Sequence, residues 1–110
     1  MAQGGAGIAA DDDWARLERF DWDEGNSRKS VDKHGVSRVE AEQVFVNEPL
    51  LVLADERHGR QEVRFHALGH TDAGRLLHVT FTLRHNDTVI RVISARPMHR
   101  KERLCYEEET

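Results

Sequence analysis

The chain of 110 residues has room for one domain with a single hydrophobic core. It has one cysteine, Cys105, and no apolar run of bilayer length, so we expect neither an internal disulfide nor a membrane span. The net charge of −4 is unevenly spread, because acidic residues gather at both ends and leave a mildly basic body that holds all 7 histidines.

The N-terminal part of the chain differs from the rest in composition. Residues 1–18 are rich in glycine, alanine and aspartate, and we expect them to be a disordered or loosely ordered acidic extension. This start has no basic segment followed by an apolar one, so a secretory signal is not indicated and a cytoplasmic protein is expected. Residues 19–110 then form a single domain, which begins with a short strand over 19–22.

Two helices are predicted after this strand. Asp23 can cap a helix over 24–33, and Gly35 would end it, because glycine readily takes the left-handed conformation found after helices. The pattern Ser-Arg-Val-Glu that begins at Ser37 is a capping box, which predicts a second helix over 38–46. Both helices are short enough to pack on one sheet.

The second half of the chain reads as strands separated by turns. The clearest strand alternates leucine, valine and phenylalanine with histidine and threonine, which indicates one buried and one exposed face. Turns rich in aspartate, asparagine and glycine mark the boundaries. The predicted strands cover 50–54, 62–69, 76–84 and 88–96, and a helix over 98–108 ends the domain.

These elements predict an α+β fold in the order β-α-α-β-β-β-β-α. Consecutive strands joined by short turns form an antiparallel sheet, and such a sheet is often covered by helices on one face only. The other face would then carry side chains that are unusual for a purely structural sheet, namely Arg64, His66, His78, Thr80 and Arg91.

The chemistry of this face suggests a substrate with phosphate groups. Cleavage of RNA by its own 2′-hydroxyl needs a base for the hydroxyl proton, a cation for the phosphorane and an acid for the leaving 5′-oxygen. Glu62, Arg64, His66 and His78 can supply these groups from neighbouring strands. The alternative for the two histidines is a solvated cross-strand pair. No cysteine pair and no nucleotide-binding glycine loop is present, and we expect no metal site and no cofactor.

Two further basic segments have both a functional and a structural interpretation. Lys33 and His34 end the first helix, where cations are favoured for helix stability alone. The last strand carries Arg91 and Arg96 and leads into a basic helix, an arrangement that can hold a phosphate backbone. The alternative is an edge strand whose arginines pair with surface carboxylates.

Taken together, several segments resemble the BrnT family of toxins from type II toxin–antitoxin systems. The resemblance runs from about Phe20 to Glu108 and lies in Trp22-Asp-Glu, Asp32-Lys-His-Gly-Val-Ser, Glu40-Ala, Val44-Phe, Arg91-Val-Ile-Ser-Ala-Arg, Glu102-Arg and Tyr106. It implies a RelE-like fold, a ribonuclease that stops translation and growth, and neutralisation by a BrnA-type antitoxin. The antitoxin would carry a ribbon-helix-helix region, so the chain would meet operator DNA only through it.

The resemblance also carries functional positions onto this chain. They are Lys33, His34, Glu62, Arg64, Arg91, Ser94 and Arg96. We assign Arg64 and Arg91 to phosphate charge, His66 or His34 to proton transfer, and Glu62 to orienting one of these histidines. RNA binding is assigned to Lys33, Arg96 and His78. Ser30 departs from the family pattern, because many relatives have asparagine there.

Two alternatives to a metal-independent endoribonuclease follow from the same residues. The first is a RelE-like binding module that has lost catalysis and acts with its antitoxin in operon repression. The second is an α+β interaction domain whose basic residues only solvate its surface. Retained basic residues would serve any of the three.

Overall fold

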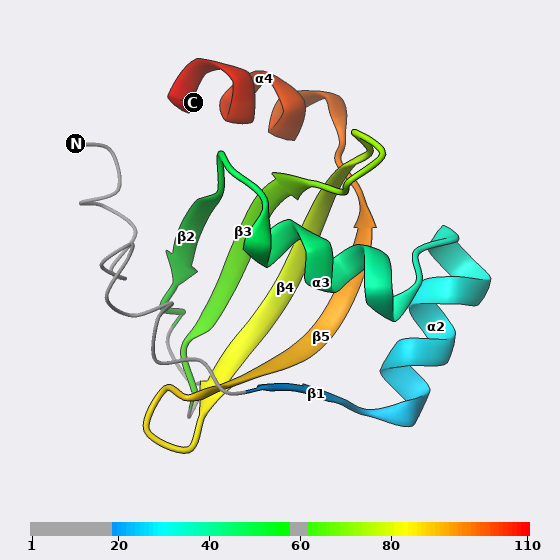
Figure 1. Ribbon diagram of the computed structural model, residues 1–110. Helices are drawn as coiled ribbons and strands as arrows, with labels where there is room; N and C mark the ends of the chain where they lie inside the picture. The colour runs from blue at the N-terminus through cyan, green and yellow to red at the C-terminus, as the bar shows by residue number, and fades with distance from the viewer. Residues whose placement is uncertain (1–18, 58–61) are drawn as a thin grey trace.

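The computed structural model describes residues 19–57 and 62–110, in which five strands form one sheet (Figure 1). The expected extension over 1–18 lies outside the described residues. The sheet order is β1-β5-β4-β3-β2, with bounds β1 Arg19–Trp22, β2 Leu51–Asp55, β3 Arg64–His70, β4 Leu76–Arg84 and β5 Val89–Pro97. The predicted order of elements is confirmed, although β2 and β3 begin one and two residues later than the sequence indicated.

The pairing of β1 differs from the prediction. β2, β3, β4 and β5 form an antiparallel meander, whereas β1 runs parallel to β5, with Phe20 beside Ile90 and Trp22 beside Val92. The sheet is therefore mixed and not wholly antiparallel. The physical reason is that β1 is not joined to its neighbour by a tight turn, so the hairpin rule that fixes the other pairs does not apply to it.

Three helices accompany the sheet, and the first two follow the predicted caps, whereas the last begins two residues later than predicted. The helix α2 covers Glu24–His34, α3 covers Arg38–Val46 and α4 covers Arg100–Glu109. Asp23 accepts from the first backbone N–H groups of α2, and Gly35 closes that helix with φ of 64°. The capping box of α3 is formed on both sides, with Ser37 and Glu40 each accepting from the other's backbone N–H.

The main core lies between α3 and one face of the sheet. Leu77, Val79 and Phe81 point from β4 into this core and are fully buried, as their alternation predicted. Phe45 of α3 meets Phe81 edge-on, with ring centroids 5.1 Å apart. Gly69 of β3 allows the close approach of α3, since a Cβ there would lie 2.8 Å from a methyl group of Val44.

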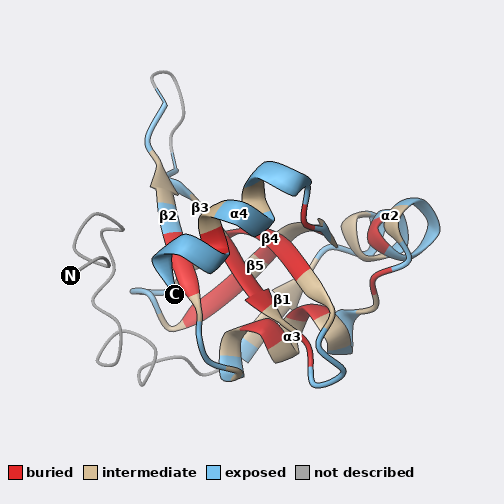
Figure 2. Ribbon diagram, turned by 90° about the horizontal axis from the view of Figure 1, so that it is seen from above, coloured by how far each residue is buried: buried red, intermediate tan, exposed pale blue. Residues whose placement is uncertain are grey.

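A smaller core lies on the opposite face of the sheet, which we call the second face, and α4 covers it. Leu51, Leu68, Met98 and Tyr106 form this cluster, and Tyr106 donates a hydrogen bond to the carbonyl of Pro49 at 2.6 Å. Seen from above, α3 and α4 lie on opposite sides of the strands (Figure 2). The prediction that helices occupy one face is therefore wrong for α4.

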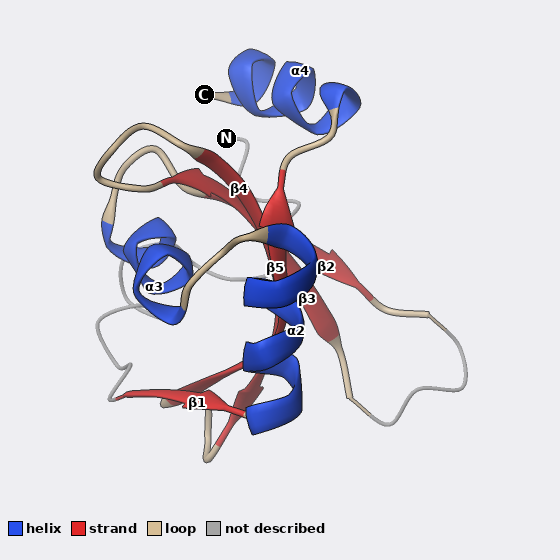
Figure 3. Cartoon of the chain, turned by 90° about the vertical axis from the view of Figure 1, so that its right-hand side faces the viewer, coloured by secondary structure: helices blue, strands red, loops and turns tan. Residues whose placement is uncertain are grey.

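The remaining helix, α2, lies along the edge of β5 beyond the end of β1 (Figure 3). Because β1 pairs only with residues 89–92, the backbone of β5 further along needs another partner. Ser30 of α2 supplies it, since its buried hydroxyl accepts from the N–H of Ala95 at 3.2 Å. No helix within the described ranges is long and apolar enough to span a membrane.

Candidate active site

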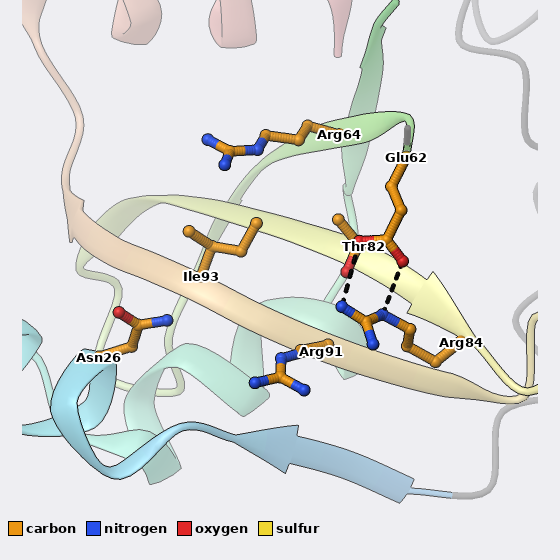
Figure 4. A pocket seen from close by; sticks show the side chains of 7 residues that line it. All are labelled: Asn26, Glu62, Arg64, Thr82, Arg84, Arg91 and Ile93. Atoms are coloured by element: carbon orange, nitrogen blue, oxygen red, sulfur yellow. Dashed lines mark hydrogen bonds and ion pairs between the residues drawn. The ribbon is translucent and has the colours of Figure 1, made fainter. Parts of the chain in front are cut away.

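A cleft of about 770 Å³ opens on the second face, beside the part that α4 covers (Figure 4). Its walls come from α2, from the start of β3, and from the strands β4 and β5. The side chains that line it are Asn26, Glu62, Arg64, Thr82, Arg84, Arg91 and Ile93. Three of the predicted site residues therefore share one cleft: Glu62, Arg64 and Arg91.

Arg64, Thr82 and Arg91 lie in one row across three neighbouring strands. Thr82 is the register partner of Arg91. Phe65, which follows Arg64, pairs with Phe81, which precedes Thr82, so Arg64 and Thr82 lie opposite each other on the antiparallel strands β3 and β4. Rows of this kind place side chains of the same face within reach of one ligand. The backbone positions of Arg64 and Arg91 thus lie on either side of Thr82, and their guanidinium groups extend from this row along the cleft (Figure 4).

The two predicted phosphate-binding arginines differ in their contacts. Arg64 is exposed and makes no ion pair with any residue of the described part of the chain. Arg91 is partly buried and faces Asp21 at 3.6 Å and Asp23 at 3.8 Å, longer than a hydrogen bond. Such open pairs are weak, so both guanidinium groups can turn to an anionic ligand.

A third arginine in the cleft, Arg84, is paired with Glu62. The Nε of Arg84 lies 2.9 Å from one carboxylate oxygen of Glu62, and its Nη2 donates to the other at 3.1 Å. This ion pair, with its one hydrogen bond from Nη2, fixes the direction of the carboxylate, which remains nearly half exposed. Glu62 is thus held by an arginine, whereas the prediction was that it orients a histidine.

Thr82 is the most enclosed polar group of the cleft. Its side chain is 3% exposed, and within the described residues its hydroxyl oxygen is buried without a hydrogen-bond partner. A buried polar group without a partner costs about 1–3 kcal/mol and needs an explanation. The paired side chains of Glu62 and Arg84 lie beside this hydroxyl (Figure 4), so it is part of the floor of the cleft.

His66 lies next to Arg64 on the same face, about 7 Å further along β3. Its Nε2 is 3.3 Å from a carboxylate oxygen of Asp55, and its Nδ1 is 3.1 Å from the hydroxyl of Thr80 and 3.0 Å from Nε2 of His78. The rings of His66 and His78 stack at 5.0 Å. The two predicted histidines are therefore together, but they do not line the cleft.

His78 lies deeper, between the sheet and α4. Burial lowers its pKa from 6.5 to about 4, and the positive charge of Arg96 acts in the same direction. The carboxylate of Glu102 opposes this shift, but its nearest oxygen is 3.9 Å from Nδ1 of His78. At neutral pH the His78 ring is thus uncharged, and its side chain is only 8% exposed.

Arg96, predicted to bind RNA, is engaged within the protein. Its two terminal nitrogens donate to the two carboxylate oxygens of Glu102 at 2.9 and 2.8 Å, which ties β5 to the first turn of α4. Although burial works against it, this pairing and the backbone N–H of His99 lower the pKa of Glu102 to about 2. Arg96 therefore lies in a structural ion pair, and its assignment to RNA stays a prediction.

The remaining predicted positions lie away from the cleft. Asn26 lines the cleft from the first turn of α2, whereas Lys33 and His34 occupy the last turn, about 12 Å along the helix axis. Ser94 is on β5 beyond Ile93 and opposite Thr80. The roles proposed for Lys33, His34 and Ser94 stay predictions, but these residues do not line the cleft that holds the arginines.

Sequence reasoning missed four residues that line the cleft: Asn26, Thr82, Arg84 and Ile93. The alternation of β4 places Thr82 and Arg84 on the same face as His78, which was a usable signal. Ile93 had the same signal because it follows Arg91 by two residues on β5, whereas Asn26 had none because its position depends on how α2 and β5 meet. Among residues 19–57 and 62–110, no group of three metal-ligating side chains comes together.

Comparison with known proteins identifies the family of this chain. Residues 22–102 match the family model described as "Ribonuclease toxin, BrnT, of type II toxin-antitoxin system". A search of curated proteins found no match. The crystal structure of the Brucella abortus ribonuclease toxin BrnT is similar in fold, with a TM-score of 0.53 and 20% identity, over 76% of this chain and 100% of that one. Because the family match covers most of the sequence, the chain belongs to the BrnT family of ribonuclease toxins from type II toxin–antitoxin systems.

Proposed function

We propose that this chain is a metal-independent endoribonuclease that cleaves RNA in the arginine-lined cleft and is neutralised by a BrnA-type antitoxin. The observation that carries the proposal is the convergence of Arg64, Arg84 and Arg91, from three strands, on one open cleft that also holds a carboxylate. Guanidinium groups suit phosphate because they donate in pairs and keep their charge.

The charge of the phosphorane is the first requirement that the cleft meets. Arg64 and Arg91 line the same cleft from β3 and β5, so a phosphate seated between them receives two cations. Groups fixed in advance around developing negative charge give the largest single contribution in many enzymes. These cations belong to the protein, and the proposed step therefore uses no metal ion.

Proton transfer is assigned to Glu62 and His66. Glu62 takes the proton of the 2′-hydroxyl, whose oxygen then bonds to phosphorus while the bond from phosphorus to the 5′-oxygen breaks. His66 donates the proton to that leaving oxygen, which requires exchange of one of its present contacts. The products are a 2′,3′-cyclic phosphate and a free 5′-hydroxyl. His34 is the weaker candidate because it lies at the far end of α2.

The antitoxin is proposed to use the same surface. A face that binds phosphate also attracts an acidic protein segment, because both present negative charge. An antitoxin segment over the cleft would block Arg64 and Arg91 directly, and its ribbon-helix-helix region would bring the complex to operator DNA. Charge reversal by Arg64→Glu should weaken antitoxin binding, and unchanged affinity would show that the antitoxin binds elsewhere.

One observation favours the alternative of a silent binding module. Both ring nitrogens of His66 have partners within the protein, and Glu62 is held by Arg84. A cleft in which these groups never leave their partners would bind RNA or an antitoxin without cleaving. This alternative keeps the role of the arginines and removes only the chemical step.

Induced expression in a bacterium tests the proposal. The chain is expressed alone and beside its operon neighbour, and growth and total RNA integrity are followed together. We expect growth arrest with RNA decay in the cytoplasm, relieved by the neighbour. Cleavage of purified RNA should persist in a metal chelator. Normal growth with intact RNA from soluble protein would favour the binding module.

A further inference from the structure

One corner of the cleft has a different chemistry from the rest. Most of the lining is charged or carries a hydroxyl, but Ile93 is aliphatic and Asn26 presents a neutral amide (Figure 4). Neither residue has a role in the cleavage step proposed above. An apolar surface and an amide suit a nucleobase, which has a flat face and a hydrogen-bonding edge.

The contact between α2 and β5 places these two side chains at the same level. Ser30 of α2 bonds to the backbone of Ala95 of β5. One helical turn before Ser30 is Asn26, about 6 Å back along the axis, and two residues before Ala95 is Ile93, about 7 Å back along the strand. Because α2 and β5 run in the same direction from this contact, Asn26 and Ile93 come together at the cleft wall.

The alternation of β5 explains why an isoleucine faces this cleft, because Ile93 follows Arg91 by two residues and therefore points to the same side of the sheet. The register of β4 with β5 shifts so that Phe81 pairs with Val92 and Thr80 with Ser94, which leaves Ile93 without a cross-strand partner. This β-bulge shifts the alternation only after Ile93, so that Ala95 points into the core, and bulges occur often next to active sites. The partly buried Ile93 therefore lines the cleft instead of the core.

The amide of Asn26 is available for a ligand. Its backbone N–H is bonded to Asp23, but its side chain makes no hydrogen bond with any residue that the structure describes. The side chain is only partly exposed and borders the cleft. An amide has both donors and an acceptor, so it can distinguish bases by their edges.

We propose that Asn26 and Ile93 form a nucleobase subsite, in which an unpaired base of single-stranded RNA packs on Ile93 and hydrogen-bonds to the amide of Asn26. The inference rests on the proposed ribonuclease function, because it assumes that the adjacent phosphate is held by the cleft arginines. Arg91 and Ile93 are two residues apart on β5, about 7 Å, so one nucleotide can place its phosphate at the former and its base at the latter.

Binding of uncleavable oligonucleotides tests the subsite. The probes are 2′-O-methyl tetramers of A, C and U and an abasic tetramer, and affinity is measured by fluorescence anisotropy. We expect the wild type to bind the base-bearing tetramers unequally and about tenfold more tightly than the abasic one. Ile93→Ala should remove most of the gain over the abasic tetramer, and Asn26→Ala should remove the differences among bases.

Matched controls come from exposed positions away from the cleft. Lys29→Ala changes the exposed side of α2, and Val46→Ala truncates an aliphatic side chain on α3 that is 73% exposed. Both should keep the full base dependence, and circular dichroism should show all four variants folded. Equal binding of all four tetramers by the wild type would overturn the inference, as would base dependence retained in Asn26→Ala.

The two proposals fail in different ways. The 2′-O-methyl group removes the nucleophile, so the binding measurement does not require a cleavage step. Base-dependent binding together with intact unmodified RNA would leave the subsite standing and refute the ribonuclease. Cleavage of RNA without any base dependence in binding would leave the ribonuclease standing and refute the subsite.

Discussion

Acidification should destabilise this fold through His78, and the size of the effect follows from its burial. The ring lies between β4 and α4 and is 8% exposed, and burial lowers its pKa to about 4. In the unfolded chain the same ring has a pKa of about 6.5. The unfolded state therefore binds more protons than the folded state between these two pH values, and stability falls as pH falls through this window.

The expected loss is large enough to measure. Each pKa unit is equivalent to about 1.4 kcal/mol, so the full difference contributes about 3 kcal/mol to unfolding once the pH is below about 4. About 2 kcal/mol of it is already lost between pH 7 and pH 5. Over that range Glu102 stays ionised in the fold, where its pKa is about 2, and mostly ionised in the unfolded chain, where its pKa is 4.5. Its own contribution is lost only at lower pH.

Urea unfolding of the wild type and His78→Gln at several pH values between 7.5 and 5 measures this effect. The variant lacks the ionisable ring, so its stability should fall less with acid, by about 2 kcal/mol. His85→Asn is the control, because His85 is exposed in a turn and has the positive φ of 53° that asparagine tolerates. Its curve should run parallel to that of the wild type. Parallel curves for wild type and His78→Gln would refute the reasoning.

Four further predictions concern the cleft, the edge of β5 and the N-terminus. Arg64→Ala and Arg91→Ala should each abolish growth arrest and leave the melting temperature unchanged, whereas the control Lys29→Ala should still arrest growth. A lowered melting temperature would mean that these arginines are structural. The slope of log affinity for single-stranded RNA against log salt should fall by about 0.7 in each arginine variant, because one phosphate contact is lost. Ser30→Ala should lower the free energy of unfolding by about 1–3 kcal/mol in urea, because a buried backbone N–H of β5 loses its acceptor, and an unchanged value would mean that water replaces it. Deletion of residues 1–13 should leave growth arrest intact, and loss of toxicity would assign them a function.

The sequence was informative wherever structure is decided locally. The alternation in β4 predicted the buried set that includes Phe81, and the capping box at Ser37 and the glycine at 35 predicted helix ends. The sequence did not indicate which side of the sheet α4 covers. Most of that helix is charged and only Tyr106 is buried, so its pattern gave no strong apolar face to read.

The site shows the same division between local and non-local information. Glu62, Arg64 and Arg91 were identified because charged residues at exposed strand positions are visible in the sequence. The meeting of Asn26 with Ile93 was not, because it depends on the contact between Ser30 and β5. Register and bulges are set by packing across the sheet, which no single segment encodes.

The second face is divided between the part that α4 covers and the part that holds the cleft, and the pair His66 and His78 lies at the boundary. On one side α4 covers the sheet and is tied to it by Arg96 and Glu102. On the other side Arg64, Arg84 and Arg91 line the cleft. Protonation of His78 would place a new charge under α4 but leaves every guanidinium charged. Acid should therefore loosen the end of the domain that α4 covers before it affects phosphate binding, so RNA affinity and α4 packing should respond to pH separately.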